Sequence, residues 1–282
     1  LANTAWLAGT AALMALSLVL GCGRWWAVLA AMDLRATRFG RLLSYYLAGH
    51  FVSNALPTTI GGDVVRVARQ AKDNGDSAAS FASVIIERLT GWLVLPLITA
   101  VGLLVDPSLR ELGRATVAAV GVAAVTLGAL IAILVAADHP RLLGRFAASE
   151  DWRRFAGAIH LGVNRLRRHP AAATNVVVVG LAYQVVLLLA DTAAARALEI
   201  DEATVTVMLA FYPAVLIAQV LPIGIAGLGV REGAFVLFLT PLGVPPERAI
   251  ALGLLLYLVN LGVSLVGAPS FATGGRGLRS RR

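Results

Sequence analysis

The apolar run from Ala115 to Ala137 constrains this chain most, because it carries no charged residue and is long enough to cross a bilayer as a helix. Four further apolar runs of spanning length cover residues 5–31, 81–105, 172–190 and 249–269, and the first two of these include a few charged residues. Charged residues make up only 14% of the chain, whereas about 25% is usual in soluble domains. These runs predict an all-α polytopic membrane protein with five full spans.

The basic residues predict how the chain is oriented. The formal charge of +8 comes from arginine almost alone, since Lys72 is the only lysine. Residues 138–170 hold seven arginines against three acids, and the tail at 270–282 is also rich in arginine. The positive-inside rule places both segments in the cytoplasm, and the acidic stretch at 191–202 outside. We therefore expect a multi-pass protein of the cell membrane with a cytoplasmic C-terminus, and one or two amphipathic helices within 138–170.

Two segments interrupt the apolar pattern with the same spacing, at 56–66 and 221–232. In each, Leu-Pro is followed by four residues, a glycine, three residues and an arginine. The apolar arms on either side are short, and the 15 residues at 42–56 would rise only about 22 Å as a helix. Because the hydrocarbon core is about 30 Å thick, we interpret each break as the tip of a re-entrant hairpin.

The order of these elements predicts an inverted repeat. A span–hairpin–span unit at about 5–105 is followed by a second at about 172–269, with opposite orientation. Residues 106–171 connect the two units and 270–282 form the tail, within a single transmembrane domain, 1–282. Threading the spans brings the first hairpin in from the cytoplasm and the second from outside. This architecture recurs in transporters whose sites lie at broken helices, and the alternative is two proline-kinked helix pairs with chance similarity.

Each hairpin tip begins a half-helix whose free amides and dipole favour an anion. We predict that Arg66 and Arg231 bind a lipid phosphate there, while glycines let the ligand approach the backbone. The predicted headgroup-binding residues are Arg66, Arg231, Gly61, Gly62, Gly227 and Gly229. The counter-charge or gating residues are Asp63, Glu87, Arg88 and Glu232, and the hairpin tips are Asn54, Pro57, Pro222 and Gly224. The alternative is that these acids and arginines only neutralise one another and pin the hairpins.

Three other polar residues lie in apolar surroundings. We expect Glu87 to face the bundle, whereas the direction of its neighbour Arg88 stays open because consecutive helix residues diverge by about 100°. Arg24 lies near the end of the first span and is expected to snorkel to the headgroups. His50 is a candidate proton relay, although a lone histidine is more often structural.

The sequence favours no enzyme class. It has no P-loop, no His-Glu-x-x-His and no Gly-x-Ser-x-Gly motif. Its one cysteine, Cys22, lies in an apolar run, and its histidines lack metal-ligand spacing. No soluble basic face suggests nucleic-acid binding. We therefore expect no enzymatic activity, no cofactor and no metal site.

The order of the motifs resembles the lysylphosphatidylglycerol synthase transmembrane (flippase) region family. The matching stretches run from Phe51 to Pro57, then Gly61-Gly62-Asp63-x-x-Arg66, Ser83-x-x-x-Glu87-Arg88, and Pro222-x-Gly224-x-x-Gly227-x-Gly229-x-Arg231-Glu232-Gly233. The resemblance covers about 24–268 and implies an integral membrane protein. The best-understood members translocate aminoacylated phosphatidylglycerol and carry a C-terminal domain for aminoacyl transfer. This sequence resembles a stand-alone member without that synthase domain.

Together these features predict a lipid translocase. Its substrate would be an anionic or aminoacylated phospholipid or a polyprenyl-phosphate-linked lipid. One alternative is a membrane-embedded transferase acting on lipid-linked sugars, which requires Asp63 and Glu87 to meet without arginine neutralisation. The other is a non-transporting partner of a lipid-modifying enzyme, with closed hairpins and no cavity. A lipid-modifying enzyme and a second copy of the chain are the candidate protein partners.

Overall fold

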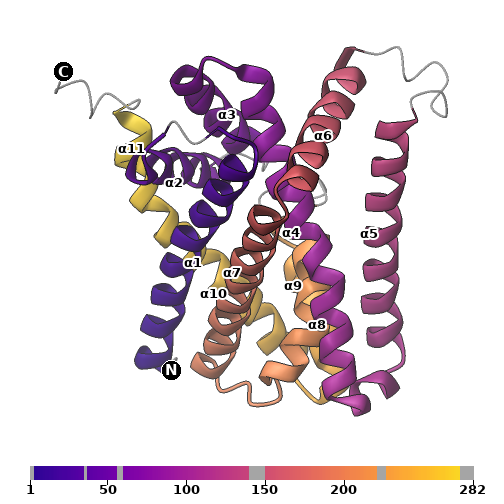
Figure 1. Cartoon of the computed structure of the whole chain (residues 1–282). Coiled ribbons are helices and arrows are strands. Elements are labelled where there is room, and N and C mark those ends of the chain that lie inside the picture. Colours follow the sequence, from indigo (N-terminus) through magenta and orange to yellow (C-terminus); the bar gives the residue numbers. More distant parts are fainter. Residues whose placement is uncertain (1–2, 35–36, 56–59, 140–149, 221–226, 274–282) are drawn as a thin grey trace.

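Helices account for all the regular structure in the part of the chain that the computed structural model describes, residues 3–34, 37–55, 60–139, 150–220 and 227–273 (Figure 1). The α-helices are α1 (Thr4–Ala31), α2 (Phe39–Ala55), α3 (Ile60–Asn74), α4 (Ser77–Val105), α5 (Arg114–Asp138), α6 (Glu150–Arg168), α7 (Pro170–Ala197), α8 (Val205–Ala218), α9 (Val230–Leu239), α10 (Pro246–Ser264) and α11 (Ala268–Ala272). Short 3-10 helices are η1 (Pro107–Glu111), η4 (Thr240–Leu242) and η5 (Leu265–Gly267).

Five helical stretches are long and apolar enough to cross a membrane: α1, α4, α5, α7 and the continuous stretch from α10 to α11. They coincide with the five predicted spans, so the all-helical fold class is confirmed. The fourth span is longer than predicted, because α7 continues past residue 190 to Ala197. Asp191 was expected in an outer acidic stretch but is buried inside this helix, so that placement was wrong.

Small residues allow the spans to pack closely. A Cβ atom on Gly102 of α4 would overlap the backbone of Ala210 in α8, so the two helices meet almost backbone to backbone. On α1, a Cβ atom on Gly23 would lie 3.7 Å from Val179 of α7. Close approach through small residues is a main source of helix association in a bilayer, where lipid is as apolar as the side chains.

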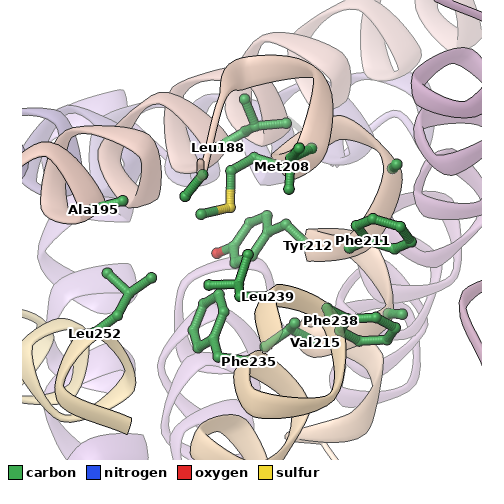
Figure 2. Packing of buried hydrophobic residues seen from close by; sticks show 14 of the residues in the cluster. Leu188, Ala195, Met208, Phe211, Tyr212, Val215, Phe235, Phe238, Leu239 and Leu252 are labelled. Atoms are coloured by element: carbon green, nitrogen blue, oxygen red, sulfur yellow. The ribbon is translucent and has the colours of Figure 1, made fainter. Parts of the chain in front are cut away.

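The largest apolar cluster joins α7, α8, α9 and α10 (Figure 2). Phe211 of α8 stacks on Phe238 of α9, with ring centroids 5.2 Å apart and planes 12° from parallel. Phe235 and Leu252 complete the contact between α9 and α10 within the same cluster. This packing fixes α9, and with it Arg231, relative to the neighbouring spans.

The segment predicted to be amphipathic contains one helix, α6, in the part that the structure describes. Ile159 is buried beside Ala137 of α5 and Ile85 of α4, while Arg154 points outward and pairs with Glu150 at 3.2 Å. The apolar face of α6 thus packs against the helical bundle.

The two predicted hairpins correspond to α2–α3 and α8–α9, which lie toward opposite ends of the bundle in Figure 1. The α2–α3 pair is near the end where α1 finishes and α4 begins, whereas α8 and α9 are near the end where α7 finishes. This placement is compatible with the predicted opposite entry. The inverted repeat and the re-entrant path themselves stay predictions, and the tip residues Pro57, Pro222 and Gly224 lie outside the described residues.

Candidate functional site

A cavity of about 290 Å³ lies between the two hairpins and the surrounding spans. Of the predicted site residues, it brings together Asn54 of α2, Gly62, Asp63 and Arg66 of α3, Glu87 and Arg88 of α4, and Arg231 of α9. Gly61, Gly227, Gly229 and Glu232 are not among its lining residues. Arg66 and Arg231 lie 165 positions apart in the sequence, at equivalent places in the two motifs, and both line this one cavity.

Glu87 is the carboxylate at the centre of the N-terminal half of the site. Its side chain faces the bundle and is 1% exposed, as predicted. Arg24 donates from Nε to Oε1 at 2.8 Å, and Arg66 donates from Nη2 to Oε2 at 3.1 Å. Each carboxylate oxygen therefore accepts a charge-assisted hydrogen bond from a different helix, which joins α1, α3 and α4.

The expectation that Arg24 snorkels to the headgroups was wrong. Its side chain is buried, bonded to Glu87, and its guanidinium lies 4.7 Å from the centre of the Tyr183 ring. A buried carboxylate offers this cation a better partner than a long reach to the interface. Gly91 makes room for it, because a Cβ atom there would lie 2.7 Å from Arg24 Nη1.

Arg66 is enclosed by aromatic rings. Its guanidinium lies 4.3 Å from the centre of the Trp25 ring and 4.8 Å from that of Tyr46, and its Nη1 lies 3.4 Å from Asp63. Stacking of this kind suits the planar guanidinium and retains its charge in an apolar setting. Arg66 is thus held on several sides by the protein itself.

Asp63 connects the hairpin to α4 through Arg88, whose Nε donates to Asp63 Oδ2. The sequence left the direction of the Arg88 side chain open. In the structure, this side chain lines the cavity and pairs with Asp63 rather than with Glu87. The three arginines of this half, at positions 24, 66 and 88, exceed the two carboxylates at 63 and 87 by one charge.

Gly62 permits close contact between the two arms of the first hairpin. A Cβ atom on Gly62 would overlap the Gly49 carbonyl oxygen and the Ser53 hydroxyl on α2. From sequence we expected this glycine to let a ligand approach the backbone. In the structure, the absence of a side chain at Gly62 allows α2 to lie against α3.

The C-terminal half of the site differs, because Glu232 satisfies its own helix. Its Oε2 accepts a hydrogen bond from the Gly229 amide at 2.5 Å, so the start of α9 already has an anionic cap. Gly229 and Gly227 have φ angles of 83° and 78°, which glycine adopts without strain. These glycines shape the turn into α9, and the amide expected to bind ligand is engaged by the protein.

Among the described residues, Arg231 is the cavity cation with the weakest protein contacts. Its Nε lies 3.7 Å from Glu232 Oε1, too far for a hydrogen bond, and has no hydrogen-bond partner there. The Nε of Arg66 also has no such partner, but Arg66 donates from Nη2 to Glu87. Its guanidinium is 5.7 Å from the centre of the Tyr257 ring. Buried donors are normally satisfied, so this side chain retains hydrogen-bonding capacity for a ligand.

An amide and imidazole network closes one side of the cavity. Asn260 of α10 donates to Asn54 Oδ1 at 2.8 Å, and its own Oδ1 lies 3.2 Å from His50 Nε2. Among the described residues, the polar side chains that contact His50 are the amides of Asn260 and Asn54, which does not support the relay hypothesis. Sequence reasoning missed Asn260 and Tyr183, although each is a polar residue within an otherwise apolar span.

Metal-ligating residues do not gather in the parts of the chain that the structure describes: no three of His, Cys, Asp and Glu lie close enough to hold an ion. The cavity is instead lined by arginines, carboxylates and neutral hydrogen-bonding groups. This chemistry suits a polar or anionic group approached from the membrane.

The comparison with protein families agrees with the resemblance seen in the motifs. The family model described as "Lysylphosphatidylglycerol synthase TM region" matches residues 1–267. The chain therefore belongs to this family of membrane proteins. No curated protein and no solved structure matches the chain. With five apolar helices of sufficient length, the family places it among multi-pass membrane proteins with a role connected to membrane lipids.

Proposed function

We propose that the cavity receives the phosphate-bearing headgroup of an anionic membrane lipid and that the protein translocates this lipid across the bilayer. The observation that carries the proposal is the cavity between the two hairpins, where four arginines face two carboxylates. An excess of positive charge favours an anion, and guanidinium groups match a phosphate in geometry. Anionic or aminoacylated phospholipids and polyprenyl-phosphate-linked lipids all carry the required phosphate.

Arg231 is the proposed primary contact for that phosphate. Arg24 and Arg66 are held by Glu87 at hydrogen-bond distance, and Arg88 is held by Asp63. Among the described residues, Arg231 has a longer contact with Glu232 and lies over the Tyr257 ring. Bringing a phosphate to Arg231 therefore breaks the fewest interactions. Arg66 and Arg88 line the same cavity and contribute further positive charge.

The opposite placement of the hairpins supports a path with access from both leaflets. If α2–α3 and α8–α9 open in turn, the headgroup meets the same arginines from each side, as in transporters built from repeats. We place the protein in the cell membrane with the α6 segment and the C-terminus in the cytoplasm, on the basis of their arginines. A lipid-modifying enzyme or a second copy of the chain is a proposed partner.

The two alternative functions require other geometries. A transferase was expected to hold Asp63 and Glu87 together without arginine neutralisation, but both carboxylates are paired with arginines. A non-transporting partner was expected to have closed hairpins without a cavity, but a cavity lies between them. Translocation without covalent chemistry is therefore the function that this geometry supports best.

The test is lipid exchange in proteoliposomes, with acyl-labelled fluorescent phosphatidylglycerol and dithionite quenching from outside. We expect the wild-type protein to expose inner-leaflet label, and Arg231→Gln to lower the rate at least tenfold. Arg114→Gln is the matched control, because Arg114 is exposed at the start of α5 and is not among the residues that line the cavity. Wild-type exchange by a correctly folded Arg231→Gln variant would show that Arg231 does not bind the headgroup.

A further inference from the structure

Besides its charged residues, the cavity between the two hairpins is lined by neutral hydrogen-bonding side chains. They include His50 and Asn54 of α2, Asn260 of α10, and Gln219, the residue that follows α8. Amides carry no charge, and an imidazole with its ordinary pKa is mostly neutral at pH 7. The lining therefore combines an arginine-rich group with an uncharged polar group, and the uncharged group decides which headgroups fit beside the phosphate.

The imidazole of His50 cannot satisfy both neighbouring asparagines. Its Nε2 lies 3.2 Å from Asn260 Oδ1 and 3.3 Å from Asn54 Nδ2. A neutral ring nitrogen either donates one hydrogen bond or accepts one. If Nε2 donates to Asn260, one N–H of Asn54 is left over, because the other bonds the His50 carbonyl oxygen at 3.0 Å. If Nε2 accepts from Asn54, the Asn260 oxygen is left over.

Asn260 keeps a further donor in both arrangements. Its Nδ2 carries two N–H groups. One donates to Asn54 Oδ1 at 2.8 Å, and the other has no partner among the described residues. Gln219 adds another amide donor and acceptor to the lining. A hydroxyl group both donates and accepts, so it is the ligand group that matches this remaining capacity.

The carboxylates that line the cavity are already bonded to arginines. Glu87 accepts from Arg24 at 2.8 Å and from Arg66 at 3.1 Å. Asp63 accepts from Arg88. A ligand ammonium group needs such an acceptor, so it could gain one here only by displacing an arginine.

Glu232 does not alter this balance. It is not among the residues that line the cavity, and its Oε2 accepts from the Gly229 amide. Its Oε1 lies 3.7 Å from Arg231 Nε and has no hydrogen-bond partner among the described residues. Even with this third acid, the four arginines of the lining remain in excess. A cationic headgroup would enter a site of its own charge sign.

We propose that the site selects a phosphate ester whose headgroup carries hydroxyl groups and no ammonium group. The phosphate binds Arg231, and the hydroxyls bind the amides of Asn54 and Asn260. Phosphatidylglycerol and a polyprenyl-phosphate sugar share this chemistry. Lysylphosphatidylglycerol lacks it, because aminoacylation converts a glycerol hydroxyl to an ester and adds ammonium charge. This inference rests on the proposed function and narrows it, since it removes aminoacylated lipids from the candidate substrates.

The first experiment measures lipid binding to the full wild-type chain by native mass spectrometry in detergent, with lipids that share the same acyl chains. Phosphatidylethanol has the phosphodiester of phosphatidylglycerol but no hydroxyl. We expect phosphatidylglycerol to bind about fivefold more tightly than phosphatidylethanol, the effect of one net hydrogen bond. It should bind at least about tenfold more tightly than lysylphosphatidylglycerol, because like charges repel. Equal or tighter binding of lysylphosphatidylglycerol would overturn the proposal.

The second experiment tests the amides through a ratio of affinities. Asn260→Leu should abolish the preference for phosphatidylglycerol over phosphatidylethanol and leave phosphatidylethanol binding within about twofold of wild type, because the phosphate contact remains. A purely structural role would weaken both lipids alike. Asn175→Leu is the matched control, since Asn175 is exposed on α7 and does not line the cavity. An unchanged ratio in Asn260→Leu would contradict the assignment of the hydroxyls to this amide.

The third experiment alters the charge balance. Arg88→Gln removes one positive charge and releases Asp63 from its bond to Arg88, which gives an ammonium group an acceptor. The preference for phosphatidylglycerol over lysylphosphatidylglycerol should fall by at least about fivefold. Arg114→Gln should keep the wild-type ratio. The same ratio in Arg88→Gln and the wild type would mean that the paired carboxylates do not exclude cationic headgroups.

Transport of the same lipids separates this inference from translocation itself. Wild-type protein that shows the binding preferences but exchanges no labelled lipid in proteoliposomes would contradict translocation and keep the headgroup class. Exchange of labelled phosphatidylglycerol and lysylphosphatidylglycerol at equal rates would do the reverse. A polyprenyl-phosphate hexose, added as a competitor, distinguishes the two sources of the headgroup. Stronger competition than by unlabelled phosphatidylglycerol supports the class and identifies the sugar lipid as the better ligand.

Discussion

The two hairpins bear similar sequence motifs but use their charges differently. In α2–α3, Arg66 is bonded to Glu87, lies near Asp63 and is enclosed by aromatic rings. In α8–α9, the corresponding Arg231 has one long contact to Glu232, which is occupied in capping its own helix. The difference teaches that the same motif can be used in two ways: in the first hairpin its arginine is bonded within the protein, whereas in the second its arginine is the one that we propose binds the ligand.

Loss of Glu87 should have the largest effect on stability. Glu87→Gln leaves Arg24 and Arg66 buried without their common counter-charge, and we expect a cost of about 3 kcal/mol or more in the free energy of unfolding. Thermal unfolding in detergent, followed by the loss of monodisperse protein, measures the change. Glu202→Gln is the control and should behave as wild type. Equal stability of the two variants would remove Glu87 from the centre of the network.

The next largest effect is expected from the hairpin contact at Gly62. Gly62→Ala inserts a methyl group where the Gly49 carbonyl oxygen and the Ser53 hydroxyl lie, so α2 and α3 must separate at a cost of about 1–3 kcal/mol. The same unfolding measurement applies. Gly121→Ala is the matched control, since nothing lies within 4 Å of the added atom there. A neutral Gly62→Ala would mean that the two arms are not closely packed.

Comparison of two arginine variants sharpens the difference between the hairpins. Arg66→Gln should lower stability by about 1–3 kcal/mol, because it removes charge-assisted bonds and ring contacts from a buried network. Arg231→Gln should change stability by less than about 1 kcal/mol, because its contacts are few. Denaturation curves for both variants measure the two changes in the free energy of unfolding. An equal loss of stability would show that both arginines are structural.

The polar contact between the first hairpin and α10 should have the smallest effect. Asn260→Leu removes the hydrogen bond to Asn54 and the contact with His50, and we expect a loss of about 1 kcal/mol. The double variant with Asn54→Leu should cost less than the sum of the two single changes, as a double-mutant cycle would reveal. Additive losses would indicate that the two amides do not interact.

The spans and the charged site could be predicted from sequence because both depend on patterns within short segments. Long apolar runs with few charges identified the five spans, and the spacing of Leu-Pro, Gly and Arg pointed to Arg66 and Arg231. The burial of Arg24 and Asp191 could not be predicted in this way. Their environments depend on which helices lie together, and a residue near the end of an apolar run reads equally well as interfacial or buried.

The roles of the glycines could not be predicted from sequence either. A glycine near a proline reads as a flexible tip, yet Gly62 serves a helix contact and Gly229 adopts a positive φ at the start of α9. These roles require knowledge of the backbone and its neighbours. The composition of each motif indicated where the site lies, but it did not indicate the role of each residue within the motif.

The most direct test of a headgroup site between the hairpins is a high-resolution cryo-electron microscopy map of the full chain in nanodiscs that contain phosphatidylglycerol. The account predicts an elongated acyl-chain density whose phosphate lies within hydrogen-bond distance of the Arg231 guanidinium, with the Glu87 ion pairs intact. The density should be absent in Arg231→Gln and present in Arg114→Gln. A dry, sealed contact between α8–α9 and α2–α3, with lipids resolved only around the periphery, would contradict it.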